Sequence, residues 1–300
     1  MCSERPPRLT ARDAEVRRLG NNIGGYRGET IDIAAVVADC ATTARAQGWA
    51  VEEMPLNSGP SLLALTRIRK IAAVPAVPGQ GSVAEKSAVR SQSVTPRLRV
   101  YLSTGIHGDE PAGPLAVRQL LRENQWPDAV DLWLCPCLNP AGFLMNRREN
   151  PGNLDLNRQY REPQASETLA HIAWLESQPR FDLCICLHED WESHGFYVYE
   201  LNPDRRPSLA EAVVEKVSEV CPIDLSETIE DRPARNGIIR PDVDPRARPQ
   251  WPEAFYLLTY KTRLSYTLEA PSDFALQVRV AALVTAVNTA LKLAPAAVAG

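Results

Sequence analysis

The chain has 300 residues and a formal net charge of −4, a length that can bury a sizeable core as one α/β domain or two smaller ones. Its 44% hydrophobic and 23% charged content excludes a disordered chain, and its mild acidity without a basic block gives no electrostatic case for nucleic acid. No apolar run approaches the roughly 18 to 20 residues of a membrane span and the first residues lack a signal peptide's apolar core, so we expect a cytoplasmic protein with no membrane partner.

The first third of the chain predicts one helix and two strands between two irregular segments. Residues 1–30 form a leading segment, and residues 72–96, rich in Ala, Pro, Ser and Gly, predict a flexible surface loop. Between these segments, apolar residues at helical spacing predict a helix over 31–47. Strands are predicted to follow over 49–56 and 61–68.

After residue 96 the pattern alternates between apolar strands and amphipathic helices. The predicted elements are strands over 97–104, 129–138, 181–187 and 264–269 and helices over 111–124, 166–177, 207–221 and 272–293. This alternation predicts an α/β fold with a mixed, largely parallel sheet flanked by helices. Because no composition shift marks a linker, we expect one domain over residues 1–300.

The seven cysteines do not suggest a disulfide framework, because their number is odd and they are spread over the whole chain. Two C-x-C pairs, Cys135 with Cys137 and Cys184 with Cys186, raise the alternative of a four-thiolate metal site. Chelating pairs usually have two residues between the cysteines, and both pairs lie in apolar runs that predict buried strands. We therefore expect reduced cysteines that pack in the core.

Polar side chains follow several of the predicted strands directly, which is where open α/β sheets bind ligands. His107 and Glu110 follow strand 97–104, and His188 follows strand 181–187. Two histidines and one glutamate form a three-ligand set that leaves a position for water, as in catalytic zinc sites. Each of these signals is weak when it is taken alone.

The loop after strand 129–138 adds a long polar stretch, and with it the chain resembles a known family. The motifs are G-x-H-G-D-E (105–110), N-P-x-G (139–142), R-x-N (148–150), D-L-N-R (155–158), a strand-ending histidine and T-L-E (267–269). Together they resemble the zinc carboxypeptidases of the M14 type. The stretch around His188 is similar to the small bacterial cytoplasmic branch near succinylglutamate desuccinylase and aspartoacylase. The resemblance covers roughly residues 97–200 well and 264–275 more thinly.

The resemblance implies a mixed eight-stranded sheet flanked by helices and one zinc ion per chain. It also implies roles for seven side chains: zinc coordination by His107, Glu110 and His188, carbonyl polarisation by Arg148, binding of the substrate's terminal carboxylate by Asn157 and Arg158, and general base catalysis by Glu269. Zinc is inferred from the type of ligand, and cobalt or another divalent ion fits the same donors.

Several neighbouring residues leave alternatives open. Glu189 and Asp190 either orient a ligand histidine or are plain loop acids. Asp109 stands where digestive family members carry a substrate-contacting arginine, so substrate contacts need not match theirs. This departure is shared with the amidase and desuccinylase branches.

Two further features of the family are not fixed by any local motif. The family's mobile tyrosine has only weak candidates here, Tyr256 and Tyr260. Asp242, Asp244 and Glu253 could favour a basic substrate side chain, although such acids are usually just solvated.

The leading functional hypothesis is a metallocarboxypeptidase that removes one C-terminal residue from peptides. The second is a deacylase of N-acyl amino acids, because both substrates place an amide beside a free carboxylate. A non-catalytic binding protein on the same scaffold is the third, and it predicts loss of a metal ligand or of the base.

Overall fold

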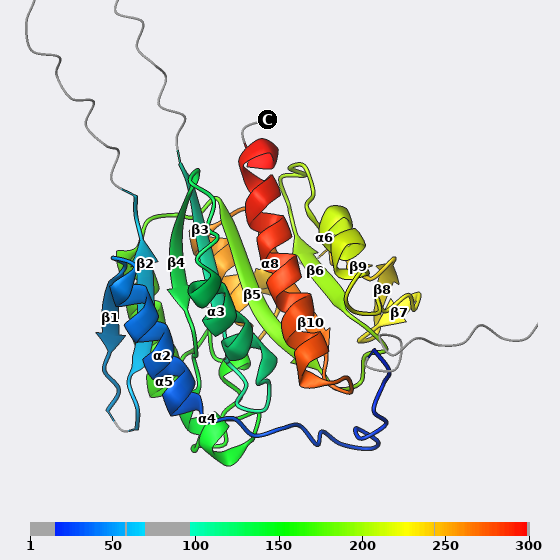
Figure 1. The fold of residues 1–300 in the computed structure, drawn as a ribbon, viewed down its shortest axis with the longest axis horizontal. Helices are drawn as coiled ribbons and strands as arrows, with labels where there is room; N and C mark the ends of the chain where they lie inside the picture. The colour runs from blue at the N-terminus through cyan, green and yellow to red at the C-terminus, as the bar shows by residue number, and fades with distance from the viewer. Residues whose placement is uncertain (1–15, 58, 70–96, 243, 299–300) are drawn as a thin grey trace, which may run out of the picture.

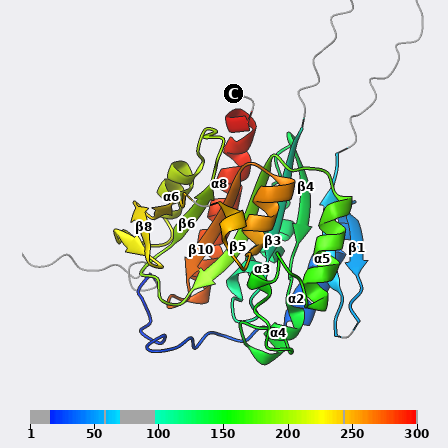
Figure 2. The ribbon, with the colours of Figure 1, turned by 180° about the vertical axis from the view of Figure 1, so that it is seen from behind.

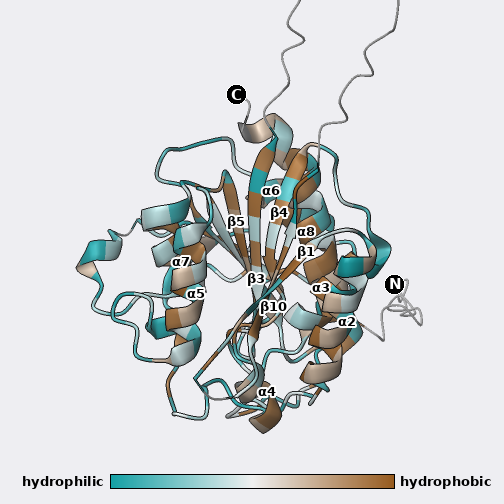
Figure 3. Ribbon diagram, turned by 90° about the vertical axis from the view of Figure 1, so that its left-hand side faces the viewer, coloured by the Kyte–Doolittle hydropathy of each residue, from teal (hydrophilic) through white to brown (hydrophobic). Residues whose placement is uncertain are grey.

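The structure is a computed structural model that describes residues 16–57, 59–69, 97–242 and 244–298. It has three layers, with one twisted sheet between two layers of helices (Figures 1 and 3). The loop predicted over 72–96 lies outside the described residues.

The sheet contains ten strands in the described part of the chain, in the order β1-β2-β4-β3-β5-β10-β6-β9-β8-β7. Their bounds are β1 (Ala50–Met54), β2 (Leu62–Arg67), β3 (Leu98–Thr104), β4 (Val130–Cys135), β5 (Leu183–Asp190), β6 (Tyr197–Leu201), β7 (Thr228–Ile229), β8 (Arg232–Arg235), β9 (Ile238–Ile239) and β10 (Ser265–Pro271). The four central strands β4, β3, β5 and β10 are parallel, whereas most outer pairs are antiparallel. The predicted mixed α/β sheet is thereby confirmed.

One face of the sheet carries α2 (Ile33–Ala46), α3 (Ala112–Glu123), α6 (Ala210–Val217) and α8 (Leu276–Val298), which lie in front of the strands in Figure 1. The other face carries α5 (Ser166–Ser177) and the short α7 (Glu253–Tyr256), which come to the front in Figure 2. A separate cluster of buried apolar side chains fills each interface. Strand β5 is buried along its whole length, as expected of a parallel strand covered on both faces.

The resemblance implies eight strands, whereas the described residues form ten. The additional strands lie mainly at one edge of the sheet. There β7, β8 and β9 have two to four residues each, too few to produce an alternating apolar signal. They form because each can pair with a neighbour, and β9 extends the sheet from β6. The short helix α4 (Pro140–Met145) was also not predicted, and it starts at Asn139, whose side chain accepts a hydrogen bond from the Gly142 amide.

The C-terminal helix α8 is long and apolar enough, by length and composition, to cross a membrane over Leu276–Ala297. In the fold it packs against α3 and α6, and many of its apolar side chains belong to the core on that face of the sheet.

Candidate metal centre and active site

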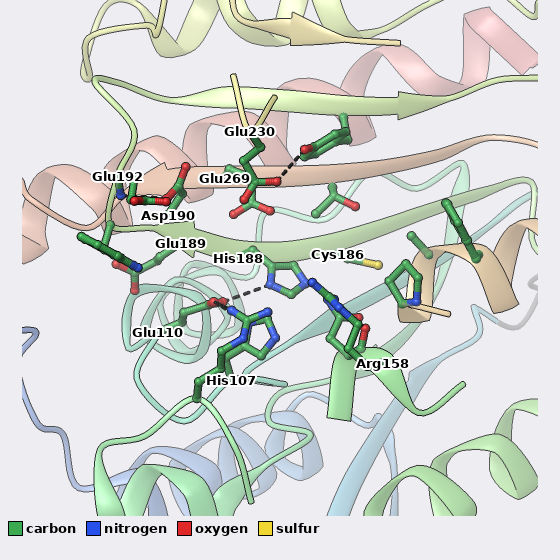
Figure 4. Close-up of a pocket in the computed structure, with 18 of the residues that line it drawn as sticks. His107, Glu110, Arg158, Cys186, His188, Glu189, Asp190, Glu192, Glu230 and Glu269 are labelled. Carbon is green, nitrogen blue, oxygen red and sulfur yellow. Dashed lines mark hydrogen bonds and ion pairs between the residues drawn. The ribbon is translucent and has the colours of Figure 1, made fainter. Parts of the chain in front are cut away.

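The candidate functional residues gather at the carboxyl edge of the parallel strands. His107 and Glu110 lie in the loop between β3 and α3, and His188 lies near the end of β5. Glu269, near the end of β10, pairs in register with His188. Because adjacent parallel strands end at the same edge, these side chains from distant parts of the sequence face one cavity (Figure 4).

Glu110 is the centre of the predicted metal site. One of its carboxylate oxygens lies 2.5 Å from His107 Nδ1, and the other lies 3.0 Å from His188 Nδ1. One ligand atom from each residue lies within 4.8 Å of the others, and all three side chains are buried. Two imidazole nitrogens and one carboxylate therefore converge on a single point, and this donor set fits a divalent metal with an open position.

The charge state of the triad also fits a cation. Burial raises the pKa of Glu110, but His107 and His188 outweigh burial and hold it well below its usual range. The carboxylate is therefore ionised, and it lies beside the two imidazoles and 3.9 Å from the Arg148 guanidinium. A divalent ion held by these three side chains would balance its negative charge.

Gly108 allows the loop between His107 and Glu110 to lie directly on the backbone of α4. A Cβ at this position would come within 2.1 Å of the Gly142 backbone and 2.4 Å of the Phe143 backbone. The glycine is therefore needed for close backbone approach. This contact fixes the path of the chain between His107 and Glu110.

Glu269, the predicted base, lies within the cavity and in register with His188, one of the predicted metal ligands. Burial raises the pKa of Glu269 well above its usual value; His188 opposes that rise, while Glu110 and Glu230 add to it. Tyr266 lies three residues before Glu269 and therefore faces the opposite side of β10, where its hydroxyl donates to the buried Glu200.

The loop between β4 and α5 brings three polar side chains to the same cavity. Arg148 Nε donates to Asp155 at 3.0 Å, and Arg148 Nη1 lies 3.3 Å from His107 Nδ1. Burial lowers the pKa of Arg148, but Asp155 and Glu110 outweigh burial and keep it above its usual value. The guanidinium is therefore a fixed positive charge next to the predicted metal ligands.

Asn157 and Arg158 lie on the short helix η1 (Leu156–Arg158) at the cavity wall. The side-chain oxygen of Asn157 accepts a hydrogen bond from the Glu253 backbone amide at 2.8 Å. Arg158 Nη1 donates to the Asn157 carbonyl at 2.8 Å. The structure thus brings every predicted site residue into one cavity of about 440 Å³.

The acids next to His188 have structural partners. Glu189 is buried, accepts from the Ala112 amide and pairs with Arg279. Asp190 accepts from the Tyr197 hydroxyl and from the Glu192 amide. Neither is hydrogen-bonded to His188 in the structure, so these acids fix the surrounding backbone and helices.

The candidates for the mobile tyrosine and for a specificity acid lie outside the cavity lining. Tyr256 is buried against other aromatic rings, and Tyr260 is 53% exposed. Glu253 is buried and accepts hydrogen bonds from Tyr101 and Ser103. Asp242 and Asp244 are exposed, and the latter caps the 3₁₀ helix η2 (Pro245–Ala247).

Sequence reasoning missed the cavity residues that lie outside the family motifs. Tyr199 and Glu230 line the cavity, and the Tyr199 hydroxyl donates to Glu230 at 2.6 Å. Tyr26, from the leading segment, lines it as well. No motif marks these positions, although Tyr199 falls within residues 97–200, which the resemblance covers well.

The six cysteines described by the structure are all buried and free. Burial raises the pKa of both Cys184 and Cys186 well above the usual thiol value. The four cysteines of the C-x-C pairs are thus packed in the core, as the sequence predicts.

Comparisons with known proteins agree on the type of chemistry. Residues 96–225 match the model of the succinylglutamate desuccinylase/aspartoacylase catalytic domain. Carboxypeptidase SOL1 of Arabidopsis thaliana is 32% identical in an alignment of 111 residues that covers 28% of this chain and 21% of SOL1. Carboxypeptidase 2 of Trichophyton tonsurans is 33% identical in an alignment of 85 residues that covers 26% of this chain and 16% of that protein. The chain thus spans only about a fifth of these relatives.

Solved structures share the fold over most of the chain. A metallopeptidase candidate from Shewanella denitrificans has a TM-score of 0.70 and 21% identity, with coverage of 91% of this chain and 100% of the other. A metallo-carboxypeptidase from Burkholderia cenocepacia has a TM-score of 0.57 and 19% identity, with coverage of 87% and 67%. At these identities the likeness establishes the fold.

Proposed function

We propose that this chain, which belongs to the M14-like metallopeptidases near the desuccinylase and aspartoacylase branch, is a zinc carboxypeptidase that hydrolyses the C-terminal amide bond of peptides. One observation carries the proposal. His107, Glu110 and His188 converge within 4.8 Å, and Glu269 and Arg158 face the same cavity. The cavity therefore combines a metal site, a base and an anchor for a carboxylate.

The two histidines and Glu110 would hold the zinc ion, whose Lewis acidity lowers the pKa of a coordinated water to about 7. Glu269 takes the proton of the attacking water and passes it to the nitrogen of the leaving amine. Arg148 is already held in place by Asp155. Its guanidinium therefore stabilises the negative charge that develops on the scissile carbonyl oxygen without having to reorganise.

The substrate's free carboxylate binds to Arg158 and Asn157. A guanidinium matches a carboxylate through paired hydrogen bonds. Because the Asn157 oxygen is engaged by the Glu253 amide, its NH₂ group is the part left to donate to the substrate. Both groups sit on one short helix at the cavity wall, so they set the distance between the carboxylate and the scissile bond.

A deacylase of N-acyl amino acids is the second candidate. It is favoured by the match of residues 96–225 to the desuccinylase/aspartoacylase catalytic domain. The proposed metal site, base and carboxylate anchor serve this reaction equally, because its substrate also has an amide next to a carboxylate. We place either activity in the cytoplasm, in keeping with the free thiols of the described cysteines.

The test is hydrolysis by the zinc-loaded protein of two matched panels, dipeptides and N-acyl amino acids that share the same C-terminal residues. The metal-stripped protein is the control, and re-addition of zinc should restore its activity. Cleavage of peptides in preference to N-acyl amino acids supports the carboxypeptidase, and the reverse preference supports the deacylase. A protein that binds zinc stoichiometrically and cleaves neither panel contradicts both.

A further inference from the structure

The segment before α2 lies across the carboxyl edge of the sheet, close to the cavity. Its first anchor is Asp273, directly after β10. The Asp273 carboxylate accepts from Arg18 Nε at 2.8 Å, from the Gly20 amide at 3.1 Å and from the Asn21 amide at 2.8 Å. Asp273 is buried and follows Glu269 by four residues. The dark blue trace in Figure 1 runs along this edge from the end of β10 toward α2.

The second anchor lies six residues after Asp273, at Arg279 of α8. This guanidinium is fully buried and pairs with Glu29 of the segment and with Glu189. Glu189 also accepts a hydrogen bond from the amide of Ala112, at the start of α3. The segment is therefore connected to the residue next to His188 and to the helix that follows Glu110. Such a fully buried, paired charge holds its partners in fixed positions.

Tyr26 lies between these two anchors and lines the cavity. Its hydroxyl is buried and has no hydrogen-bond partner in the structure. Burial, with the nearby negative charge of Glu189, raises the pKa of Tyr26, so the hydroxyl keeps its proton and can donate. A buried polar group without a partner is costly, and in a cavity the missing partner is naturally supplied by a ligand.

The position of the Tyr26 ring is fixed by Gly28. A Cβ at residue 28 would overlap the Tyr26 hydroxyl, so the ring lies against the bare Cα of the glycine. Any side chain at residue 28 must displace the ring. The chain thus offers a second substitution that moves the hydroxyl without altering Tyr26 itself.

The Tyr26 side of the cavity is opposite to the carboxylate anchor. Glu189 and Asp109 are the cavity acids whose charges act on Tyr26. Figure 4 shows Glu189 and Arg158 on opposite sides of His188. If Arg158 holds the leaving residue, the acyl portion of the substrate extends across the metal site toward Tyr26.

We infer that the Tyr26 hydroxyl binds the acyl portion of the substrate, by a hydrogen bond to the first polar group beyond the scissile carbonyl. The inference rests on the proposed function. It makes Tyr26 a specificity-determining residue that favours substrates whose acyl side is itself a peptide. The segment 18–29 then forms part of the substrate site.

The test compares two substrates with the same C-terminal residue, an N-acetyl-dipeptide and an N-formyl amino acid. Only the first has polar groups beyond the scissile carbonyl. In the zinc-loaded protein, Tyr26→Phe should lower kcat/KM for the N-acetyl-dipeptide by roughly three- to tenfold, the effect of one hydrogen bond, and leave the N-formyl substrate unchanged. Gly28→Ala should give the same selective loss, and combining it with Tyr26→Phe should add little.

Tyr260→Phe is the matched control, because this exposed tyrosine is outside the cavity lining, and it should change neither rate. Equal losses on both substrates in Tyr26→Phe would overturn the inference, since a packing role affects both alike. Unchanged rates on both substrates would overturn it too. An inactive wild-type protein on both substrates would instead contradict the proposed function.

Discussion

Glu269 and His188 form a register pair on the parallel strands β10 and β5. The proposed base and one proposed metal ligand therefore occupy the same rung of the sheet. Sites built on strands are positioned more precisely than sites on loops, so this pairing fixes the separation of the two groups. It explains how residues 81 positions apart can act on one water molecule.

The base is tested by Glu269→Gln, which keeps the shape of the side chain and removes its ability to accept a proton. We expect kcat to fall by roughly 10²- to 10⁴-fold while the bound metal stays at the wild-type level. Steady-state kinetics and elemental analysis measure the two quantities. Glu176→Gln, on the exposed side of α5, removes one carboxylate elsewhere and should be neutral. Retained activity in Glu269→Gln would refute the assignment.

The carboxylate anchor is tested by Arg158→Ala. Loss of a charge-assisted hydrogen-bonded pair should cost about 1.5 to 3 kcal/mol in kcat/KM, or roughly 10- to 150-fold. The effect should disappear with a C-terminally amidated substrate, which has no carboxylate to bind. Kinetics on the free and amidated forms of one peptide make the comparison. An equal loss on both forms would mean that Arg158 acts in some other way.

The buried His171 predicts a loss of stability in acid. Tyr101 donates its proton to Glu253, so the contact at 2.8 Å between Tyr101 and His171 has Nε2–H of the histidine as the donor. Tyr160 then donates to Nδ1, and the imidazole is neutral. Burial lowers the pKa of His171 to about 3.

Because this folded-state pKa is depressed below the unfolded value of about 6.5, the native state binds fewer protons in acid. The contribution to stability is complete above about pH 6.5 and is lost as the pH falls toward 3, by up to about 1.4 kcal/mol per pH unit. Denaturant unfolding between pH 7 and 4 should show a steeper decline for the wild type than for His171→Gln. Parallel declines would contradict a neutral buried imidazole.

The close backbone contact at Gly108 predicts that Gly108→Ala disturbs the loop that carries His107 and Glu110. The added methyl group meets backbone atoms of Gly142 and Phe143, which cannot move aside as a side-chain tip can. We expect a loss of about 1 to 3 kcal/mol of stability together with weaker metal binding, measured by thermal unfolding and zinc titration. Gly25→Ala is the control, because nothing lies within 4 Å of its Cβ position. Wild-type metal affinity in Gly108→Ala would contradict this account.

Much of the site could be predicted because its residues follow strong local signals. Strands β3 and β5 each contain an apolar run, and His107 and His188 follow these runs closely. Glu269 lies near the end of the late strand β10, within the T-L-E motif, and Arg158 lies within the D-L-N-R motif. Parallel strands then bring these ends together, so order along the chain translates directly into proximity.

Tyr26 could not be predicted, because its position depends on contacts made far along the chain. The segment that carries it is held by Asp273 and Arg279, more than 240 residues away, and has no periodic pattern of its own. Tyr256 and Tyr260 are the weak candidates that the sequence offers for the family's mobile tyrosine. In the structure their rings pack against other aromatic rings. The short edge strands escaped prediction for a similar reason, since pairing partners create them.

The most direct measurement is the metal content of the purified protein after zinc loading and dialysis, beside that of His107→Ala, Glu110→Ala and His188→Ala. The account predicts about one zinc ion per wild-type chain and a large loss of bound zinc in every variant, with hydrolysis lost in parallel. Wild-type zinc content in any of the three variants, or full hydrolysis by the metal-stripped protein, would contradict it.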